Sequence, residues 1–342
     1  MTGRADPLLA ITLLLALGLA CAPAAPAPKP TAAAPAPVQA AVPSPPAAQP
    51  AQLKPIKIGI ATTSLTYLPQ RIAVEKGFYR EEGFDPELAI IFQQGPAALA
   101  SLTAGELQIA DFTGSGARAA ATGLPVRVVA CLGVKPFYRI VLAPGVKSLK
   151  EVEGRPFGVA TLGTTPHLLG RDILQKYGVD TDKVEFLAAG DAAVRYAVLK
   201  SGQVAGGVVS IPEAIMAQQD GLTVASTADD LPAFCDSGLV VTGDTITNNR
   251  AEVTRYITAM QKAVKFLQAN PDESARILGE WAALDNEVAA ETIRLAQINS
   301  SFSTDKRVAQ EAIENVLKQA LETGGLKEDV SLSAVADLSL YP

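Results

Sequence analysis

The chain has 342 residues, of which 48% are hydrophobic and 19% charged, so it is long and apolar enough to bury a large core. Its formal net charge of −6 provides no basic field for a phosphate backbone, which argues against a nucleic-acid partner. One histidine and three scattered cysteines form no cluster with the spacing of metal ligands, so we predict neither a metal site nor a cofactor.

The first 21 residues are typical of an export signal. Arg4 supplies a positive charge, and residues 8–19 form an apolar run that is shorter than the roughly 20 residues needed to span a membrane. The run ends in LGLAC at 17–21, which resembles, with a shift of one position, the signal of bacterial lipoproteins. We therefore expect a lipoprotein-type signal peptide over 1–21, with a lipid anchor on Cys21 at the periplasmic or outer face of the cell membrane. Cleavage without a lipid is the alternative, and it also exports the protein.

Residues 22–54 are almost wholly Ala and Pro. Such a composition cannot bury a core, and it favours an extended, partly polyproline-like chain. At about 3.1 Å per residue the segment reaches up to roughly 100 Å. We predict that it is a linker between the anchor and a folded domain.

From Pro55 onward, strand-like and helix-like segments alternate. Apolar, β-type runs predict strands at 56–61, 86–93, 126–133, 139–143 and 237–243, the last being a return strand. Three further strand–helix pairs are predicted between Pro156 and Gly221, and a helical tail follows the return strand. This order predicts an α/β protein with parallel-dominated sheets and right-handed crossovers.

Gly, Ser and Thr gather where a predicted strand ends and a helix begins. These corners are Thr62-Thr63-Ser64, Gln94-Gly95, Thr113 to Gly116, Gly163-Thr164-Thr165, Gly190-Asp191 and Ser210. Each can cap a helix, but the carboxyl ends of parallel strands share one edge of a sheet, so we expect the six corners to meet there. Free N–H groups at helix starts bind anionic or polar molecules. No catalytic motif accompanies the corners, so the pattern predicts binding without catalysis.

Several motifs resemble one known family. AVEKGFYREEGF at 73–84, ALASLTAGE at 98–106, AAATGLPV at 119–126 and the segments 146–187 and 199–214 are similar to the nitrate/sulfonate/taurine family of ABC-transporter solute-binding proteins, which includes binders of thiamine pyrimidine precursors. The similarity covers nearly all of residues 55–240.

The resemblance implies a type II periplasmic-binding-protein fold, in which two lobes joined by two crossover strands close around a ligand. Lobe 1 would comprise 55–142 plus 238–342, including the helical tail, and lobe 2 would comprise 143–237. The family implies a monomeric receptor, not an enzyme. Such a receptor captures a small organic anion, for example a sulfonate, nitrate, a taurine-like molecule or a carboxylate, and delivers it to an ABC permease and its ATPase.

The predicted ligand-binding residues come from the six corners and from an aromatic pair near the first crossover. They are Thr62, Ser64, Tyr67, Gly95, Thr113, Ser115, Phe137, Tyr138, Gly163, Thr164, Thr165, Asp191, Ser210 and Pro212. Arg118 or Arg139 can pair with an anionic head, although each also fits a solvated surface position.

The sequence leaves alternatives open for the ligand and for several single residues. Asp191 and the aromatic pair suit a pyrimidine or another heterocycle as well as an anion, and fold relatives that synthesise pyrimidines make an enzyme a further alternative. Cys131 and Cys235 either form a disulfide or remain buried free thiols. His167 is either a contact at the site or a capping and packing residue, and Trp281 is expected to be a packing residue.

Overall fold

The computed structural model describes residues 52–90, 95–226 and 232–341. The signal peptide, Cys21, nearly all of the linker and Gln94 lie outside these residues. Among the residues described, no helix combines the length and the apolar character that crossing a bilayer requires.

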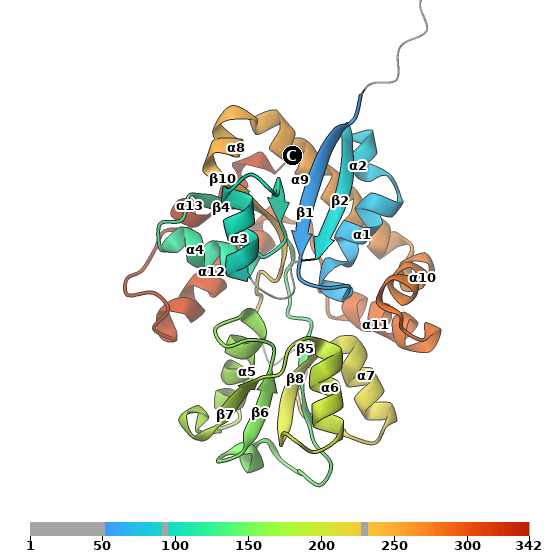
Figure 1. Cartoon of the computed structure of the whole chain (residues 1–342), viewed down its shortest axis with the longest axis vertical. Coiled ribbons are helices and arrows are strands. Elements are labelled where there is room, and N and C mark those ends of the chain that lie inside the picture. The colour runs from blue at the N-terminus through green and yellow to red at the C-terminus, as the bar shows by residue number, and fades with distance from the viewer. Residues whose placement is uncertain (1–51, 91–94, 227–231, 342) are drawn as a thin grey trace, which may run out of the picture. The chain divides into compact units, whose positions relative to one another are not determined.

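Five strands form the first sheet, in the order β2-β1-β3-β10-β4 (Figure 1). The strands are β1 Lys54–Ile60, β2 Phe84–Ile90, β3 Ile109–Ala110, β4 Val126–Gly133 and β10 Ser237–Thr242. β1 pairs in parallel with β2 and β3, whereas β10 pairs antiparallel with β3 and β4. Four of the five strands therefore run in one direction, and β10 runs against them.

The second sheet has the order β7-β6-β8-β5-β9. The strands are β5 Tyr138–Leu142, β6 Pro156–Val159, β7 Glu185–Ala188, β8 Gly206–Ser210 and β9 Thr223–Val224. β6 is parallel to β7 and β8, whereas β5 is antiparallel to β8 and β9. Below, the first-sheet half denotes residues 54–133 with 237–341, and the second-sheet half denotes 138–224.

The two sheets exchange one strand each. β10, the antiparallel strand of the first sheet, follows the second-sheet half in the chain, and β5, the antiparallel strand of the second sheet, follows the first. Two mixed sheets, each with two parallel and two antiparallel strand pairs and connected in this way, confirm the predicted two-lobed α/β class. The predicted boundary at residue 142 would leave β5 in lobe 1, whereas β5 pairs within the second sheet. An apolar strand pattern fits either sheet, and only long-range pairing shows which one it joins.

The two crossings between the sheets run side by side. The N–H of Phe234 donates to the carbonyl of Val134 at 2.8 Å, and that of Asp236 donates to Gly133 at 2.9 Å. The outgoing crossing therefore occupies 134–137, and residues 234–236 of the returning chain lie against its start.

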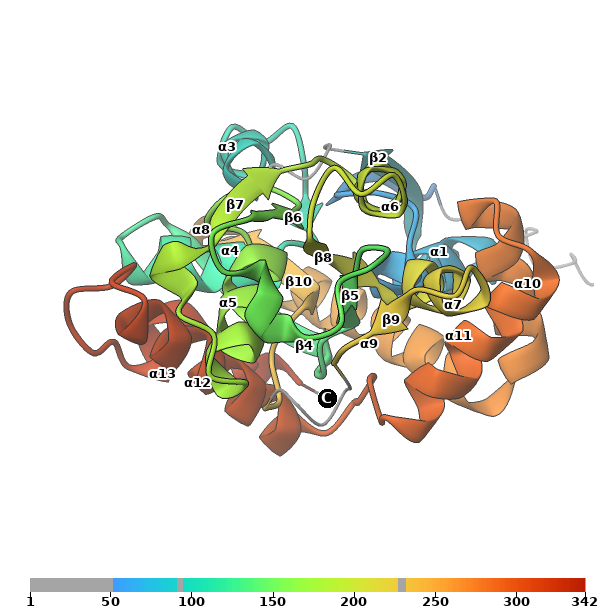
Figure 2. The same ribbon diagram turned by 90° about the horizontal axis from the view of Figure 1, so that it is seen from below.

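Helices cover both faces of each sheet (Figures 1 and 2). Those of the first-sheet half are α1 Leu68–Glu75, α2 Phe78–Glu81, α3 Gly95–Thr103, α4 Thr113–Ala121, α8 Gly243–Asn248, α9 Arg250–Ala269, α10 Pro271–Ala282, α11 Asn286–Ile298, α12 Lys306–Glu322 and α13 Leu332–Val335. Those of the second-sheet half are α5 Thr165–Lys176, α6 Ala192–Lys200 and α7 Ile211–Gln219. As expected, prolines stand in the first turns of α1, α3, α5 and α7.

The helical tail packs mainly on the first sheet. α9 contacts α1, α2 and β4, and α12 contacts α4 and β4. The tail also reaches the second-sheet half, because α11 contacts α7 and Gln319 of α12 hydrogen-bonds Asp172 of α5. Trp281 packs, half-buried, against the main hydrophobic core, as predicted.

Candidate ligand-binding site

A cavity of about 90 Å³ lies where strand ends and helix starts of the two sheets face each other. One water needs about 10–15 Å³ by the same measure, so the cavity holds a ligand of roughly six to nine non-hydrogen atoms. Most of the predicted corners meet here. The predicted residues that line the cavity are Thr62, Ser64, Tyr67, Gly95, Ser115, Tyr138, Thr164, Thr165 and Ser210.

Helix starts from both halves supply these residues. Gly95 opens α3, Ser115 lies in the first turn of α4, Thr165 opens α5, and Ser210 directly precedes α7, at its N-cap position. Ser210 also hydrogen-bonds Glu213, the acid of the first turn of α7. The partial positive ends of several helices therefore point toward one small volume.

A groove of about 1280 Å³ adjoins the cavity and shares Ser115 and Thr164 with it. Gly163 and Asp191, two further predicted residues, line this groove and not the cavity. The carboxylate of Asp191 accepts a hydrogen bond from the N–H of Val194 at 2.9 Å and thus caps α6.

Three further predicted residues line neither the cavity nor the groove. Thr113 is buried, and its hydroxyl donates to the carbonyl of Cys235 at 3.1 Å. Phe137 is buried against Phe302, with 4.9 Å between ring centroids, because neighbouring residues of an extended chain face opposite sides and Tyr138 faces the cavity. Pro212 is buried in the first turn of α7.

Arg195 lines the cavity, although it was not among the residues predicted from the sequence. The side chain is buried, with Nε donating to the carbonyl of Val208 at 2.7 Å and Nη1 donating to that of Gly190. Burial lowers the pKa of its guanidinium. The helical spacing does indicate that Arg195 is buried, because it lies four residues before the fully buried Leu199 and therefore on the same face of α6. Of the two predicted arginines, Arg118 lines the groove, whereas Arg139 is buried and its Nη1 donates to the carbonyl of Tyr138.

Asp236 also lines the cavity, and it too was not predicted from the sequence. The hydroxyl of Tyr138 donates to its carboxylate and accepts from Thr66. Burial raises the pKa of Asp236 to about 7, although Tyr138 and the positive charge of Arg118 oppose the rise. The positive charge of Arg195 acts to lower the pKa of Tyr138, against the rise that burial causes. The cavity therefore contains an arginine and an acid, each acting on Tyr138.

A second buried acid, Asp111, supports the first-sheet side of the site. Its carboxylate accepts hydrogen bonds from Gln70 at 3.2 Å, from the hydroxyl of Ser237 at 3.0 Å and from the N–H of Gly238 at 2.8 Å. The hydroxyl of Tyr79 donates to Gln70 at 2.9 Å. Burial raises the pKa of Asp111 to about 7. The network joins α1, the end of β3 and the start of β10 behind the cavity.

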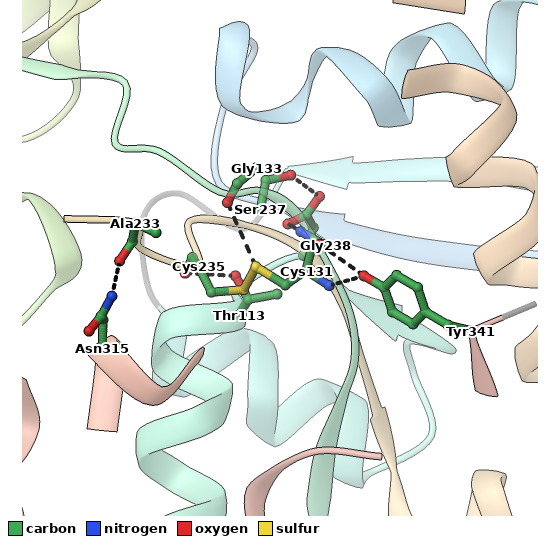
Figure 3. Close-up of a disulfide and its surroundings, with 10 residues drawn as sticks. Thr113, Cys131, Gly133, Ala233, Cys235, Ser237, Gly238, Asn315 and Tyr341 are labelled. Atoms are coloured by element: carbon green, nitrogen blue, oxygen red, sulfur yellow. Dashed lines mark hydrogen bonds between the residues drawn. A yellow bond between two sulfur atoms is a disulfide. The ribbon is translucent and has the colours of Figure 1, made fainter. Parts of the chain in front are cut away.

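Cys131 and Cys235 form a disulfide, with 5.7 Å between their Cα atoms, which decides the alternative that the sequence left open (Figure 3). The bond joins β4 to the residue before Asp236. The hydroxyl of Tyr341 bonds both the N–H and the carbonyl of Cys131, each at 2.9 Å. The backbone that carries the cavity acid is therefore attached to the first sheet.

His167 does not line the cavity. Its Nδ1 accepts a hydrogen bond from the N–H of Gly163 at 2.9 Å, and its ring packs on Phe186 with 4.8 Å between centroids. Of the two roles considered for it, the structure shows capping and packing.

Comparison with known sequences agrees with the motifs described above. The profile of a family described as NMT1/THI5 like matches residues 66–274. A binding protein of Brucella abortus is 26% identical over 238 residues, which are 68% of this chain and 72% of that protein. An ABC transporter periplasmic binding protein of Brachyspira hyodysenteriae is 26% identical over 191 residues, 54% of each chain.

Solved structures share the fold at low sequence identity. The periplasmic aliphatic sulphonate binding protein SsuA of Escherichia coli has a TM-score of 0.67 at 17% identity, covering 84% of this chain and 99% of that one. The periplasmic nitrate-binding protein NrtA of Synechocystis has a TM-score of 0.68 at 16% identity, covering 85% and 88%. Together with the profile, these matches confirm the family resemblance and the periplasmic-binding-protein fold.

Proposed function

Since the chain belongs to the NMT1/THI5-like family, we propose that it is an exported solute-binding receptor of an ABC importer. The observation that carries the proposal is the small cavity into which both halves direct helix starts, hydroxyl groups and one buried arginine. Such a site holds a molecule without reacting with it. The names of the similar proteins, which include sulphonate-binding and nitrate-binding proteins, support the same reading.

We propose a small organic anion as the solute, because Arg195 and the starts of α4, α5 and α7 all favour negative charge. The second candidate is a heterocycle such as a pyrimidine. Asp236 favours it, since a buried carboxylate can accept from a ring N–H, and Tyr67 and Tyr138 supply aromatic walls. Asp191 no longer supports that candidate, because its carboxylate caps α6.

Closure of the two halves on the solute is the proposed mechanism. A Cβ atom at Gly114 of α4 would lie 2.8 Å from the Thr165 hydroxyl of α5, so the absence of a side chain at Gly114 lets the halves approach. A solute that touches both halves favours this closed arrangement through its contacts with each of them.

The proposal includes a place in the cell and partners. Export is directed by residues 1–21, Cys21 carries a lipid, and 22–54 tether a monomeric receptor at the periplasmic or outer face of the cell membrane. The receptor delivers its solute to a permease and an ATPase. Lobe 1 comprises the first-sheet half and lobe 2 the second-sheet half.

A thermal-shift screen of sulfonates, nitrate, dicarboxylates, aromatic acids and pyrimidines tests the proposal. A true solute at 100 times its Kd stabilises the protein by about 2.7 kcal/mol. Mass spectrometry should recover the compound unchanged, and a product would favour the enzyme alternative.

Arg195→Met should weaken binding of an anion at least about tenfold, because a charge-assisted hydrogen bond contributes about 1.5–3 kcal/mol. Arg195→Lys should restore part of the affinity. Arg155→Met, at an exposed position of the same half, is the matched control. If no anion stabilises the protein, or if both Met variants bind equally well, the anion receptor is refuted.

A further inference from the structure

Two buried polar atoms at the site lack a hydrogen-bond partner among the described residues. They are Oδ2 of Asp236, an acceptor, and Nη1 of Arg118, a donor. Leaving such atoms unpaired is unfavourable, and more so when they are charged. A pair of opposite type at one site therefore indicates a missing group that can satisfy both.

Asp236 exposes only 7% of its surface and lines the cavity. Its backbone is fixed, since its N–H donates to Gly133 and its neighbour Cys235 is covalently bound to Cys131. The hydroxyl of Tyr138 already donates to the carboxylate, so Oδ2 is the oxygen that remains available. The acid is thus positioned by the protein but incompletely hydrogen-bonded by it.

Arg118 lies one turn after Gly114 in α4, at the border between the cavity and the groove. A Cβ at Gly114 would lie 3.5 Å from Nη1 of Arg118, and Gly114 itself lines the cavity. Burial lowers the pKa of Arg118 to about 10, which leaves it charged at neutral pH, and its charge acts on Asp236. The same Cβ would lie 3.6 Å from the carbonyl oxygen of Cys235, the neighbour of Asp236, so a group at the Gly114 end of the cavity lies near both residues.

The chemistry of the missing group follows from the two atoms. Above its pKa of about 7, Asp236 is ionised and accepts hydrogen bonds only. In that form it repels a carboxylate or sulfonate that accepts from Arg118, and an ammonium is attracted by Asp236 but repelled by Arg118. A carboxamide presents an N–H donor and a carbonyl acceptor side by side and satisfies both. A bound water also donates and accepts, so the experiment must separate the two.

We propose that the solute carries a carboxamide in addition to its anionic group, that Asp236 accepts from the amide N–H, and that Arg118 donates to the amide carbonyl. Arg195 and the helix starts take the anionic end. This inference rests on the proposed function and narrows it to small carboxylates or sulfonates that bear an amide.

Calorimetric titration of the full mature chain with matched probes at pH 8.5, where Asp236 is mostly ionised and Arg118 is still charged, tests the inference. Malonamate, succinamate and glutaramate are each compared with the methyl ketone of the same length, for example 4-oxopentanoate for succinamate, which keeps the carbonyl and loses the N–H donor. At least one amide should bind about tenfold or more tighter than its ketone, the factor expected for a hydrogen bond to a charged group.

Variants assign the two roles. Asp236→Ala should remove the preference for amide over ketone, whereas Arg118→Met should weaken both probes by the same factor. Asp236→Leu, which is close to aspartate in shape and cannot accept a hydrogen bond, is the second variant should the alanine protein fail to fold. Ser301→Ala is the control, because it removes a buried hydroxyl that also lacks a hydrogen-bond partner among the described residues. It should leave the affinities for the amide and for the ketone unchanged.

The outcomes separate this inference from the proposed function. Equal binding of amide and ketone, or an amide preference that survives in Asp236→Ala, overturns the inference and leaves water as the group between Asp236 and Arg118. If simple anions bind through Arg195 while no amide of the series binds, the inference also fails and the receptor function stands. If neither amides nor simple anions bind, both fail together.

Discussion

The two sheets share one strand order but are held together differently. In the first sheet, β4 is buried along almost its whole length, and the tail helices, a disulfide and the Asp111 network surround the strands. In the second sheet, three of the four residues of β7 are exposed, and only α5, α6 and α7 belong to that half. The comparison indicates that one topology can serve both as a rigid platform and as a smaller, less supported partner.

The disulfide is the strongest of these differences. Removing it with Cys131→Ala and Cys235→Ala should lower the free energy of unfolding by about 2–5 kcal/mol, because the bond closes a long loop that contains the whole second-sheet half. Urea denaturation of the double variant measures the loss, and wild-type protein under a dithiol reductant should show the same midpoint. Unchanged stability in both samples would contradict the contrast between the halves.

The two halves should also differ at matched glycines. A Cβ at Gly116 of α4 would lie 2.7 and 3.0 Å from the two methyl groups of Val240 in β10, and one at Gly170 of α5 would lie 2.6 Å from a single methyl of Val208 in β8. Overpacking costs about 1–3 kcal/mol, partly offset by the better helix propensity of alanine.

Gly116→Ala should therefore be the more destabilising of the two, because the first-sheet half has less freedom to shift. Thermal melts of both variants measure the difference. A larger loss for Gly170→Ala would show that the second-sheet half is the more rigid one.

Buried acids should make stability depend on pH. The pKa values of Asp111 and Asp236 rise from 3.8 to about 7, so between pH 4 and 7 the folded state binds more protons than the unfolded state. Stability contributed by these groups is therefore present at acidic pH and is lost as the pH rises toward 7. The upper bound is about 4 kcal/mol per group, at about 1.36 kcal/mol per pKa unit.

Asp111→Asn should flatten this dependence. The melting temperatures of the wild type and the variant, compared at pH 4.5 and at pH 7.5, measure the effect, and parallel curves would exclude a titrating Asp111. Because Asp111 belongs to the first-sheet half, the result also shows whether its network supports the platform.

The smallest expected effect on stability is at the contact between the halves. Gly114→Ala should change the free energy of unfolding by less than about 0.5 kcal/mol, because the new Cβ meets the Thr165 hydroxyl of the other half, which can move away. Affinity for a solute should fall several-fold, since closure is impeded. In the Thr165→Ala background, Gly114→Ala should lower the affinity by a smaller factor than it does in the wild type, because the clash with the Thr165 hydroxyl is absent. An unchanged affinity in Gly114→Ala would show that closure does not depend on this contact.

Local patterns predicted much of the fold. The strand expected at 126–133 is β4, and the three strand–helix pairs expected between Pro156 and Gly221 are β6 with α5, β7 with α6 and β8 with α7. Periodicity and helix-start residues are properties of short segments, so a single sequence carries them. The convergence of most corners on one cavity followed from the general geometry of parallel sheets.

Long-range pairing and side-chain direction were harder to predict. The membership of β5 in the second sheet depends on its partners β8 and β9, and the disulfide joins residues 104 positions apart. Arg195 and Asp236 were missed because each looks like an ordinary surface charge until tertiary packing buries it. Phe137 and Thr113 were placed on the wrong side because the direction of a side chain depends on the register of its element.

The exchange of β5 and β10 sets an order in which the two sheets can be completed as the chain emerges with its amino terminus first. The strands of the second sheet are contiguous in the chain and are all present once Val224 has emerged. The first sheet still lacks the strand between β3 and β4 until Thr242 has followed. The amino-terminal strands therefore emerge first and reach their final pairing last, and until then an unpaired β3 edge is exposed to other chains.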